Sequence, residues 1–147
     1  MEEKIKASVM DATKIKRVID RMATEILERN RNLKNLVIVG IRTRGIYISK
    51  RIAKIVKDLE RVDVPVGVLD ITLYRDDFSE LETQHMIQKT DIPFAIAKKD
   101  VILVDDVLMT GRTIRAAMDS LFDMGRPKSI QLLVLIDRGH RELPIRA

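Results

Sequence analysis

In its last third the chain reads Val101-Ile-Leu-Val-Asp-Asp-Val-Leu-Met-Thr-Gly-Arg-Thr113. The four apolar residues of 101–104 predict a buried strand, and the adjacent carboxylates of Asp105 and Asp106 follow at its carboxyl end. A short turn comes next, at 110–113, and a helical spacing of apolar residues begins directly after it. We therefore expect a strand, a pair of acids, a tight turn and a helix N-terminus in immediate succession.

The predicted turn is suited to binding a phosphate group. Free backbone N–H groups and the positive end of the helix dipole point into a loop that precedes a helix. Thr110 is the expected N-cap of that helix, and Gly111 lets the backbone approach a ligand closely. The carboxylates of Asp105 and Asp106 suit vicinal hydroxyls, a metal ion or a developing positive charge. Together these features predict a site for a sugar phosphate. The alternative is a solvated acidic turn in an ordinary α/β protein.

The rest of the chain alternates between helical and extended patterns. Asp11 is the expected N-cap of the first helix, Asn30 or Asn32 its end, and Gly125 the end of the last helix. Residues 75–92 are polar and lack a clean period, which predicts a mobile loop or hairpin. Helical spacing covers residues 15–27, 46–59 and 114–122, apolar strands are predicted at 36–39, 101–104 and 130–136, and an extended segment at 64–74. This alternation favours a mainly parallel sheet flanked by helices, with ligands at the carboxyl ends of its strands.

Length and composition limit the classes of protein to be considered. At 147 residues the chain is predicted to form a single domain, 1–147. It has no cysteine, no signal-peptide pattern and no apolar run long enough to span a membrane, so we expect a cytoplasmic protein without membrane contact. With two histidines, a histidine-based metal site is not expected. The net charge of +5 favours phosphate-bearing partners, while 3% aromatic residues argues against recognition by base stacking.

Three other loops carry arginines. The loop at 41–45 suits an anionic leaving group such as pyrophosphate, although a basic turn is usually just solvated. The segment 73–77 is either a salt-bridged strand end or a lid that closes over a substrate and excludes water. Residues 136–144 form either a charged C-terminal loop or a hood for a base. In a hood, backbone groups around Asp137 and Arg138 would bond a pyrimidine edge and Ile136 would pack against its face.

The stretch 101–113 resembles the signature that binds phosphoribosyl diphosphate (PRPP) in type I phosphoribosyltransferases: four apolar residues, two acids, a spacer and Thr-Gly-x-Thr. Three more segments narrow the resemblance. They are Val-Gly-Ile-Arg-Thr-Arg-Gly-Ile-Tyr (39–47), Asp-Ile-Thr-Leu-Tyr-Arg-Asp-Asp (70–77) and Asp-Arg-Gly-His-Arg-Glu-Leu-Pro-Ile-Arg (137–146). With them, nearly the whole chain is similar to the PyrR-type family of bifunctional pyrimidine-operon attenuators and uracil phosphoribosyltransferases.

The resemblance implies the type I phosphoribosyltransferase fold, an α/β fold with a mobile lid hairpin. It also implies conversion of uracil and PRPP to UMP and pyrophosphate, UMP or UTP as further ligands, and a homodimer or homotetramer. Magnesium would enter with PRPP and lie near Asp105 and Asp106, which together with Arg75 of the lid would be the catalytic residues. The implied binding residues are Thr110, Gly111, Arg112 and Thr113 for the 5′-phosphate, Arg42, Thr43, Arg44 and Gly45 for pyrophosphate, and Ile136, Asp137 and Arg138 for uracil.

The resemblance further implies binding to the leader mRNA of pyrimidine genes. Asp20 and Thr24 stand where RNA-binding members of the family carry Thr and His, and a carboxylate repels RNA phosphates, so weakened RNA binding is expected. Members of the family continue beyond the position of Ala147. Two alternatives remain open: a regulator with little turnover, and a transferase for a purine or orotate, against which the segment 137–146 argues. The predicted RNA surface comprises Arg17, Arg21, Arg29, His140, Arg141 and Arg146.

Overall fold

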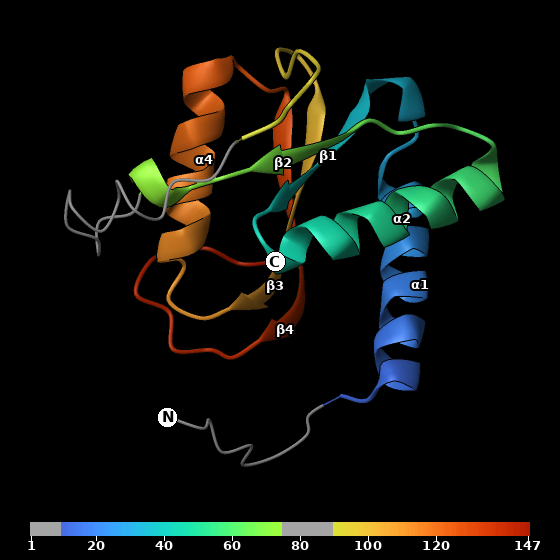
Figure 1. The fold of residues 1–147 in the computed structure, drawn as a ribbon, viewed down its shortest axis with the longest axis horizontal. Coiled ribbons are helices and arrows are strands. Elements are labelled where there is room, and N and C mark those ends of the chain that lie inside the picture. Colours follow the sequence, from blue (N-terminus) through green and yellow to red (C-terminus); the bar gives the residue numbers. More distant parts are fainter. Residues whose placement is uncertain (1–9, 75–89) are drawn as a thin grey trace.

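A computed structural model describes residues 10–74 and 90–147 of the chain. Four strands form one parallel sheet in the order β2-β1-β3-β4 (Figure 1). The elements are α1 (Ala12–Arg29), η1 (Leu33–Asn35), β1 (Leu36–Ile41), α2 (Arg44–Glu60), β2 (Val66–Leu69), η2 (Thr72–Tyr74), β3 (Asp100–Leu108), α4 (Arg112–Met124) and β4 (Ser129–Asp137). The predicted α/β architecture, a parallel sheet flanked by helices, is confirmed.

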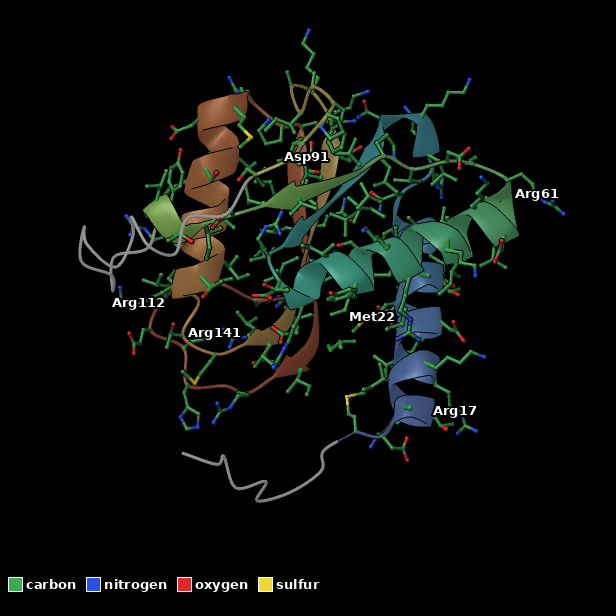
Figure 2. The ribbon with its side chains drawn as sticks, viewed as in Figure 1. Arg17, Met22, Arg61, Asp91, Arg112 and Arg141 are labelled. Atoms are coloured by element: carbon green, nitrogen blue, oxygen red, sulfur yellow. The ribbon has the colours of Figure 1, made fainter. Side chains whose placement is uncertain are left out.

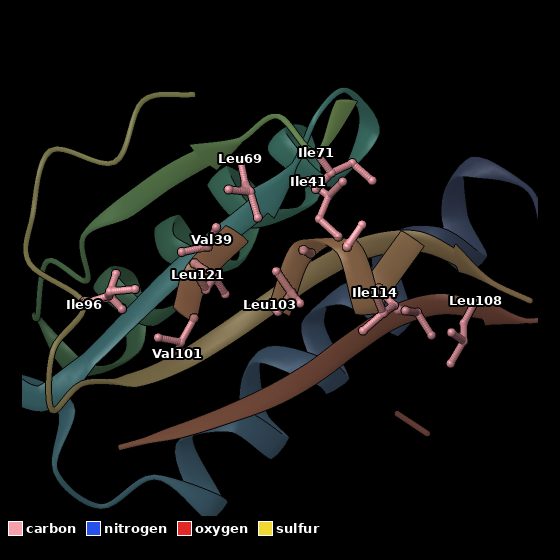
Figure 3. Packing of buried hydrophobic residues seen from close by; sticks show 14 residues of the cluster. Val39, Ile41, Leu69, Ile71, Ile96, Val101, Leu103, Leu108, Ile114 and Leu121 are labelled. Carbon is pink, nitrogen blue, oxygen red and sulfur yellow. The ribbon is translucent and has the colours of Figure 1, made fainter. Parts of the chain in front are cut away.

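Each central strand contributes to two separate cores, one on each face of the sheet. Ile102 and Val104 of β3 face α1 and α2, where they pack in the same cluster as Ile52. Leu103, between them, faces the opposite side and packs in the cluster that contains Leu121 of α4 (Figure 3). Consecutive side chains of a strand point to opposite faces, so a strand covered on both faces must be apolar throughout. This explains the unbroken apolar runs in the sequence.

Both ends of α1 lie where the sequence predicts them. The Asp11 side chain accepts a hydrogen bond from the backbone N–H of Lys14 at 2.8 Å, as an N-cap does. Asn30 is the C-cap, and it is buried. Its side-chain amide exchanges two hydrogen bonds with that of Gln131 on β4, at 3.0 and 2.7 Å. These bonds satisfy a buried polar group and attach the end of α1 to β4.

Several element boundaries differ from the sequence prediction. β3 continues four residues beyond Val104, because its ladder with β4 extends to the pair Leu108 and Asp137. The pair Asp105 and Asp106 therefore belongs to the strand and does not follow it. The extended segment predicted at 64–74 is a strand only over Val66–Leu69. The Asp70 carboxylate accepts from the Thr72 backbone N–H at 3.0 Å and starts the 3-10 helix η2.

Two helices also differ in detail from their predicted patterns. α2 begins two residues earlier than its apolar spacing indicated, at Arg44. Phe122 of α4, which the spacing placed on the buried face, is exposed. Of the predicted loop at 75–92, residues 75–89 lie outside the described part of the chain. Of the segment 73–77 predicted as a lid or a salt-bridged strand end, Leu73 and Tyr74 belong to η2, and Arg75 and the two residues after it lie outside the described part. Asp91 pairs with Val68 in an isolated antiparallel bridge. Within the residues described, no helix is long and apolar enough to cross a membrane.

Candidate functional site

Loops leave the sheet at its carboxyl edge after each of the strands β1, β3 and β4. These strands are adjacent and parallel, so the loops that follow them meet at the same edge. The loops are 42–43 before α2, 109–111 before α4 and the segment 138–147 after β4. Figure 2 labels Arg112, the first residue of α4, and Arg141, of the segment after β4, at this edge. The convergence predicted from the sequence is therefore present.

The turn between β3 and α4 forms a small cavity. Gly111 holds the N-cap position with a φ of 93°, in the left-handed region that glycine adopts without strain. The prediction of Thr110 as the N-cap is therefore wrong by one residue. The Thr110 hydroxyl nevertheless accepts a hydrogen bond from the Arg112 backbone N–H at 3.1 Å. The cavity has a volume of about 290 Å³, and residues 107–114 and Glu142 line it.

The two acids of β3 differ in their surroundings. Asp105 is buried, and its carboxylate accepts a hydrogen bond from the Asp106 backbone N–H at 2.8 Å. Burial, followed by the neighbouring Asp106 carboxylate, raises the pKa of Asp105 to about 7. The Asp106 side chain is 26% exposed and reaches the solvent side. A buried acid with a raised pKa beside a second carboxylate favours a ligand that brings positive charge or hydroxyl donors.

The loop between β1 and α2 places a guanidinium beside these acids. Nη1 of Arg44 lies 3.4 Å from Oδ2 of Asp106, and the Arg44 side chain is 81% exposed. The peptide bond between Arg42 and Thr43 is cis. A Cβ on Gly45 would collide with the carbonyl oxygen of Val104, so only glycine lets α2 begin this close to β3. The structural role of Gly45 is thus to bring the basic loop against the acidic strand.

The segment after β4 packs against the turn 109–111 between β3 and α4. The Arg138 backbone N–H donates to the Leu108 carbonyl at 2.8 Å, which continues the ladder between β4 and β3. That N–H is therefore already paired, and so is the N–H of Gly139, which donates to the Asp137 carboxylate at 2.9 Å. A pyrimidine at this edge would need other backbone groups, among them carbonyl oxygens. Ile136 is half-buried near the end of β4.

Two residues of this segment have contacts that their sequence does not reveal. Glu142 accepts a hydrogen bond from Nε of Arg112 at 2.8 Å and so adds a carboxylate to the cavity at the turn between β3 and α4. Arg141 donates to the Asp137 carboxylate through two nitrogens, at 2.8 and 2.6 Å. This contact, together with the Gly139 N–H, lowers the pKa of Asp137 to about 2. Arg112 lies 30 positions from Glu142, so no local pattern signals that contact. The four-residue spacing of Asp137 and Arg141 signals a pairing only in a helix, which this segment does not form.

The predicted RNA surface falls into separate parts. Arg17 and Arg141 lie well apart in Figure 2. Arg29 and Ala147 line one cavity of about 170 Å³ between α1 and β4, so Ala147 lies beside the C-terminal end of α1. Arg17, Arg21 and Arg29 are exposed, as are His140 and Arg146. Arg141 differs from these because its guanidinium is engaged within the protein.

Comparison with known proteins identifies the class. Residues 7–147 match the family described as "Phosphoribosyl transferase domain", and the chain belongs to this family. Its relatives include the "Bifunctional protein pyrR" of Enterococcus faecalis (strain ATCC 700802 / V583), 58% identical over 142 residues that make up 97% of this chain and 79% of that protein. The "Bifunctional protein PyrR" of Deinococcus radiodurans is 57% identical over 142 residues, which make up 97% of this chain and 78% of that protein.

Solved structures show the same fold. A hypoxanthine phosphoribosyltransferase from Staphylococcus aureus superposes with a TM-score of 0.74 at 19% identity, over 97% of this chain and 74% of that one. A purine phosphoribosyltransferase from Pyrococcus horikoshii superposes with a TM-score of 0.66 at 24% identity, over 91% of this chain and 80% of that one. At such identities the likeness concerns the fold alone, which is that of the type I phosphoribosyltransferases.

Proposed function

We propose that this protein transfers the phosphoribosyl group of PRPP to uracil, forming UMP and pyrophosphate. The observation that carries the proposal is the arrangement of the carboxyl edge. The buried Asp105, the more exposed Asp106 and the Arg44 guanidinium lie next to a turn that forms a cavity of about 290 Å³. Acids for the ribose, a cation for the leaving group and a turn for the 5′-phosphate are the groups that this reaction requires.

Each group has a task in the transfer. The turn 110–113 binds the 5′-phosphate through backbone N–H groups at the start of α4. Asp105 and Asp106 accept hydrogen bonds from the ribose 2′ and 3′ hydroxyls, and their negative charge stabilises the positive charge that develops on the ribose ring in the transition state. A uracil nitrogen forms a bond to the anomeric carbon as that carbon's bond to the pyrophosphate oxygen breaks. The proton of that nitrogen is released to solvent, and the pyrophosphate leaves toward Thr43 and Arg44.

Magnesium fits this site on the chemistry of its donors. The carboxylate oxygens of Asp105 and Asp106 are ligands that Mg²⁺ prefers, and a cation would favour the ionised form of Asp105, whose pKa is raised first by burial and then by the neighbouring Asp106. When bound with PRPP, magnesium supplies charge neutralisation of the leaving pyrophosphate. Asp105 and Asp106 would hold it directly or through a water, while Arg44 contributes the protein's own positive charge.

The second role that we propose is binding of pyrimidine leader RNA. Its support is the set of exposed arginines on α1, Arg17, Arg21 and Arg29, together with the relatives' name, which describes them as bifunctional. A positively charged surface binds the phosphates of RNA irrespective of sequence. The resemblance also implies a homodimer or homotetramer, which sedimentation velocity would test.

A panel of bases tests the enzymatic role. The protein is incubated with PRPP, Mg²⁺ and one of uracil, orotate, hypoxanthine or guanine, and the nucleotide formed is identified by chromatography. We expect UMP from uracil and none of the other nucleotides. A purine nucleotide would show that the base is misassigned. Absence of every product at saturating PRPP would leave only the regulatory role. Titration of the protein with a pyrimidine leader hairpin at several salt concentrations measures RNA binding directly.

A further inference from the structure

We propose that Arg141 is a positioning residue of the turn between β3 and α4, residues 109–111, which we call the phosphate turn. The Arg141 guanidinium holds this turn in place through a hydrogen bond to the Met109 carbonyl. This inference rests on the proposed role of the turn as the site of the 5′-phosphate, and it assigns Arg141 a task other than contact with RNA. The Arg141 side chain is only 24% exposed.

The Arg141 guanidinium joins three parts of the fold. Nη1 donates to the Met109 carbonyl at 2.9 Å, at the end of β3. Nε donates to the Ile145 carbonyl at 2.6 Å, near the C-terminus. Nη1 and Nη2 bind the Asp137 carboxylate at 2.8 and 2.6 Å, at the end of β4. A planar guanidinium used in this way holds its partners in fixed relative positions, and its charge is already balanced by Asp137.

The contact at Met109 matters because of its position at the start of the turn. β3 ends at Leu108, so Met109 is the first residue of the turn and lies beyond the ladder with β4. The next carbonyl, that of Thr110, accepts from the backbone N–H groups of Glu142 and Leu143 at 2.9 and 3.1 Å. Two successive carbonyls of the turn are thus bound by the segment 141–143.

This binding determines where the N–H groups of the turn point. In a trans peptide the C=O and the following N–H point in opposite directions. Holding the carbonyls of Met109 and Thr110 toward the segment 141–143 turns the N–H groups of Thr110 and Gly111 away from it. A Cβ on Gly111 would lie 3.4 Å from both Leu143 and Ile145, so the same segment also packs against the turn. Arg141 therefore contributes to the orientation of the donors that a phosphate would meet.

A lysine cannot reproduce this contact. Lysine carries the same charge, but its donors converge on one atom and cannot reach Asp137, Met109 and Ile145 together. A role in RNA binding depends mainly on charge, and lysine would preserve most of it. Arg141→Lys therefore separates the two roles, and Arg141→Gln removes both the charge and the contact.

The experiment measures kcat and the KM for PRPP and for uracil in Arg141→Lys, Arg141→Gln and the control Arg51→Gln. Arg51 is an exposed arginine of α2 without an assigned task. We expect the KM for PRPP to rise on the order of tenfold in both Arg141 variants, as for the loss of a hydrogen bond at a charged group. The KM for uracil should change less than threefold, and the control should match the parent. A merely structural role would lower the melting temperature and the active fraction without this selective change in KM.

A milder variant covers the case in which the Arg141 variants do not fold. Asp137→Asn keeps the size of the side chain and one acceptor oxygen, so it loosens the guanidinium without removing it. The KM for PRPP should then rise by a smaller factor. Unchanged PRPP affinity in the folded variants would overturn the proposal. So would an Arg141→Lys that retains full PRPP affinity, or variants that lose only the leader hairpin.

Calorimetry with PRPP and with inorganic phosphate separates this proposal from the proposed function. If the parent binds PRPP but transfers it to no base, the assigned reaction is wrong, and Arg141 is judged on the PRPP affinities alone. If the parent binds neither ligand, the assignment of the turn fails, and the role of Arg141 fails with it. If the parent makes UMP while Arg141→Lys and Arg141→Gln bind PRPP as tightly as the parent, only the positioning role is overturned.

Discussion

Nη1 of Arg44 lies 3.4 Å from Oδ2 of Asp106, although the two residues are 62 positions apart in the chain. The contact links the loop after β1 to the strand β3 across the carboxyl edge of the sheet. The ion pair is largely exposed, and exposed pairs of this kind contribute little to stability. Its consequence concerns ligands, because it keeps a guanidinium beside the acids that would hold the ribose.

Arg44→Gln should therefore weaken pyrophosphate binding without unfolding the protein. Losing a charged hydrogen bond to the leaving group should lower the affinity for pyrophosphate on the order of tenfold. The free energy of unfolding should change by less than about 0.5 kcal/mol. Product inhibition by pyrophosphate and denaturant unfolding measure the two effects, with Arg51→Gln as the matched control. Equal inhibition in parent and Arg44→Gln would place the leaving group elsewhere.

Asp105→Asn should change both the activity and the dependence of stability on pH. The pKa of Asp105 rises from an ordinary value of 3.8 to about 7 on folding, so between these pH values the folded protein holds a proton that the unfolded chain has released. The parent therefore loses stability as the pH rises through this window, and the loss is complete above about pH 7. Asparagine does not ionise, so the variant should not share this loss.

Denaturant unfolding of parent and Asp105→Asn at pH 5 and at pH 8 tests this expectation. Relative to the parent, the variant should gain on the order of 2 kcal/mol between the two pH values. Its rate of UMP formation should fall on the order of 10²–10³-fold, as for loss of one electrostatic contact in a transition state. A stability difference that does not vary with pH would mean that Asp105 is ionised in the folded protein at pH 5.

Thr113→Val should weaken PRPP binding and leave the fold intact. Thr113 lies in the first turn of α4 and lines the cavity at the turn between β3 and α4. Its hydroxyl and N–H can both face a phosphate there, so loss of the hydroxyl should cost about 1–3 kcal/mol of binding. Calorimetric titration with PRPP measures this cost, and circular dichroism checks the fold. Unchanged affinity would place the phosphate outside this turn.

Gly45→Ala should destabilise the protein by more than about 2 kcal/mol, because the added Cβ has no space beside the Val104 carbonyl. Relieving the collision moves the start of α2 away from β3, and Arg44 moves with it, so the affinity for pyrophosphate should fall as well. Lys50→Ala, an exposed change in the same helix, is the control and should have little effect. A Gly45→Ala variant as stable as the parent would contradict the close approach.

RNA binding should be weaker here than in RNA-binding members of the family. Asp20 is exposed on α1 between the side chains that would meet phosphates, and Arg21 already pairs with Glu25 at 3.8 Å. The Thr24 hydroxyl donates back to the Asp20 carbonyl at 3.1 Å. Each lost phosphate contact makes the slope of log affinity against log salt shallower by roughly 0.7–0.9.

The comparison is between the parent and the double variant Asp20→Thr with Thr24→His. Titrations with a pyrimidine leader hairpin at several salt concentrations should show tighter binding and a steeper salt slope for the double variant. Tight and specific binding by the parent, with no gain in the double variant, would refute this interpretation of the helix.

Features that depend on neighbouring residues could be predicted from the sequence. The cap at Asp11 and the end of α1 at Asn30 are local, and the structure places both as expected. The alternation of apolar strands and amphipathic helices was enough to predict a parallel sheet with two covered faces. The turn 110–113 could be located because its glycine and threonines are adjacent in the sequence and closely follow Asp105 and Asp106. Its cap was misplaced by one residue, since the backbone at Gly111 takes a positive φ that the sequence does not specify.

Only the tertiary structure decided how distant residues meet. The contacts of Arg44 with Asp106, of Glu142 with Arg112 and of Arg141 with Met109 all join loops that the strand order brings to one edge. The raised pKa of Asp105 likewise depends on the layers that bury it. Local propensity acts over a few residues, whereas hydrogen-bond geometry and burial depend on the register of strands far apart in the chain. The sequence therefore determined the kinds of group present at the site, and the fold determined which of them act on each other.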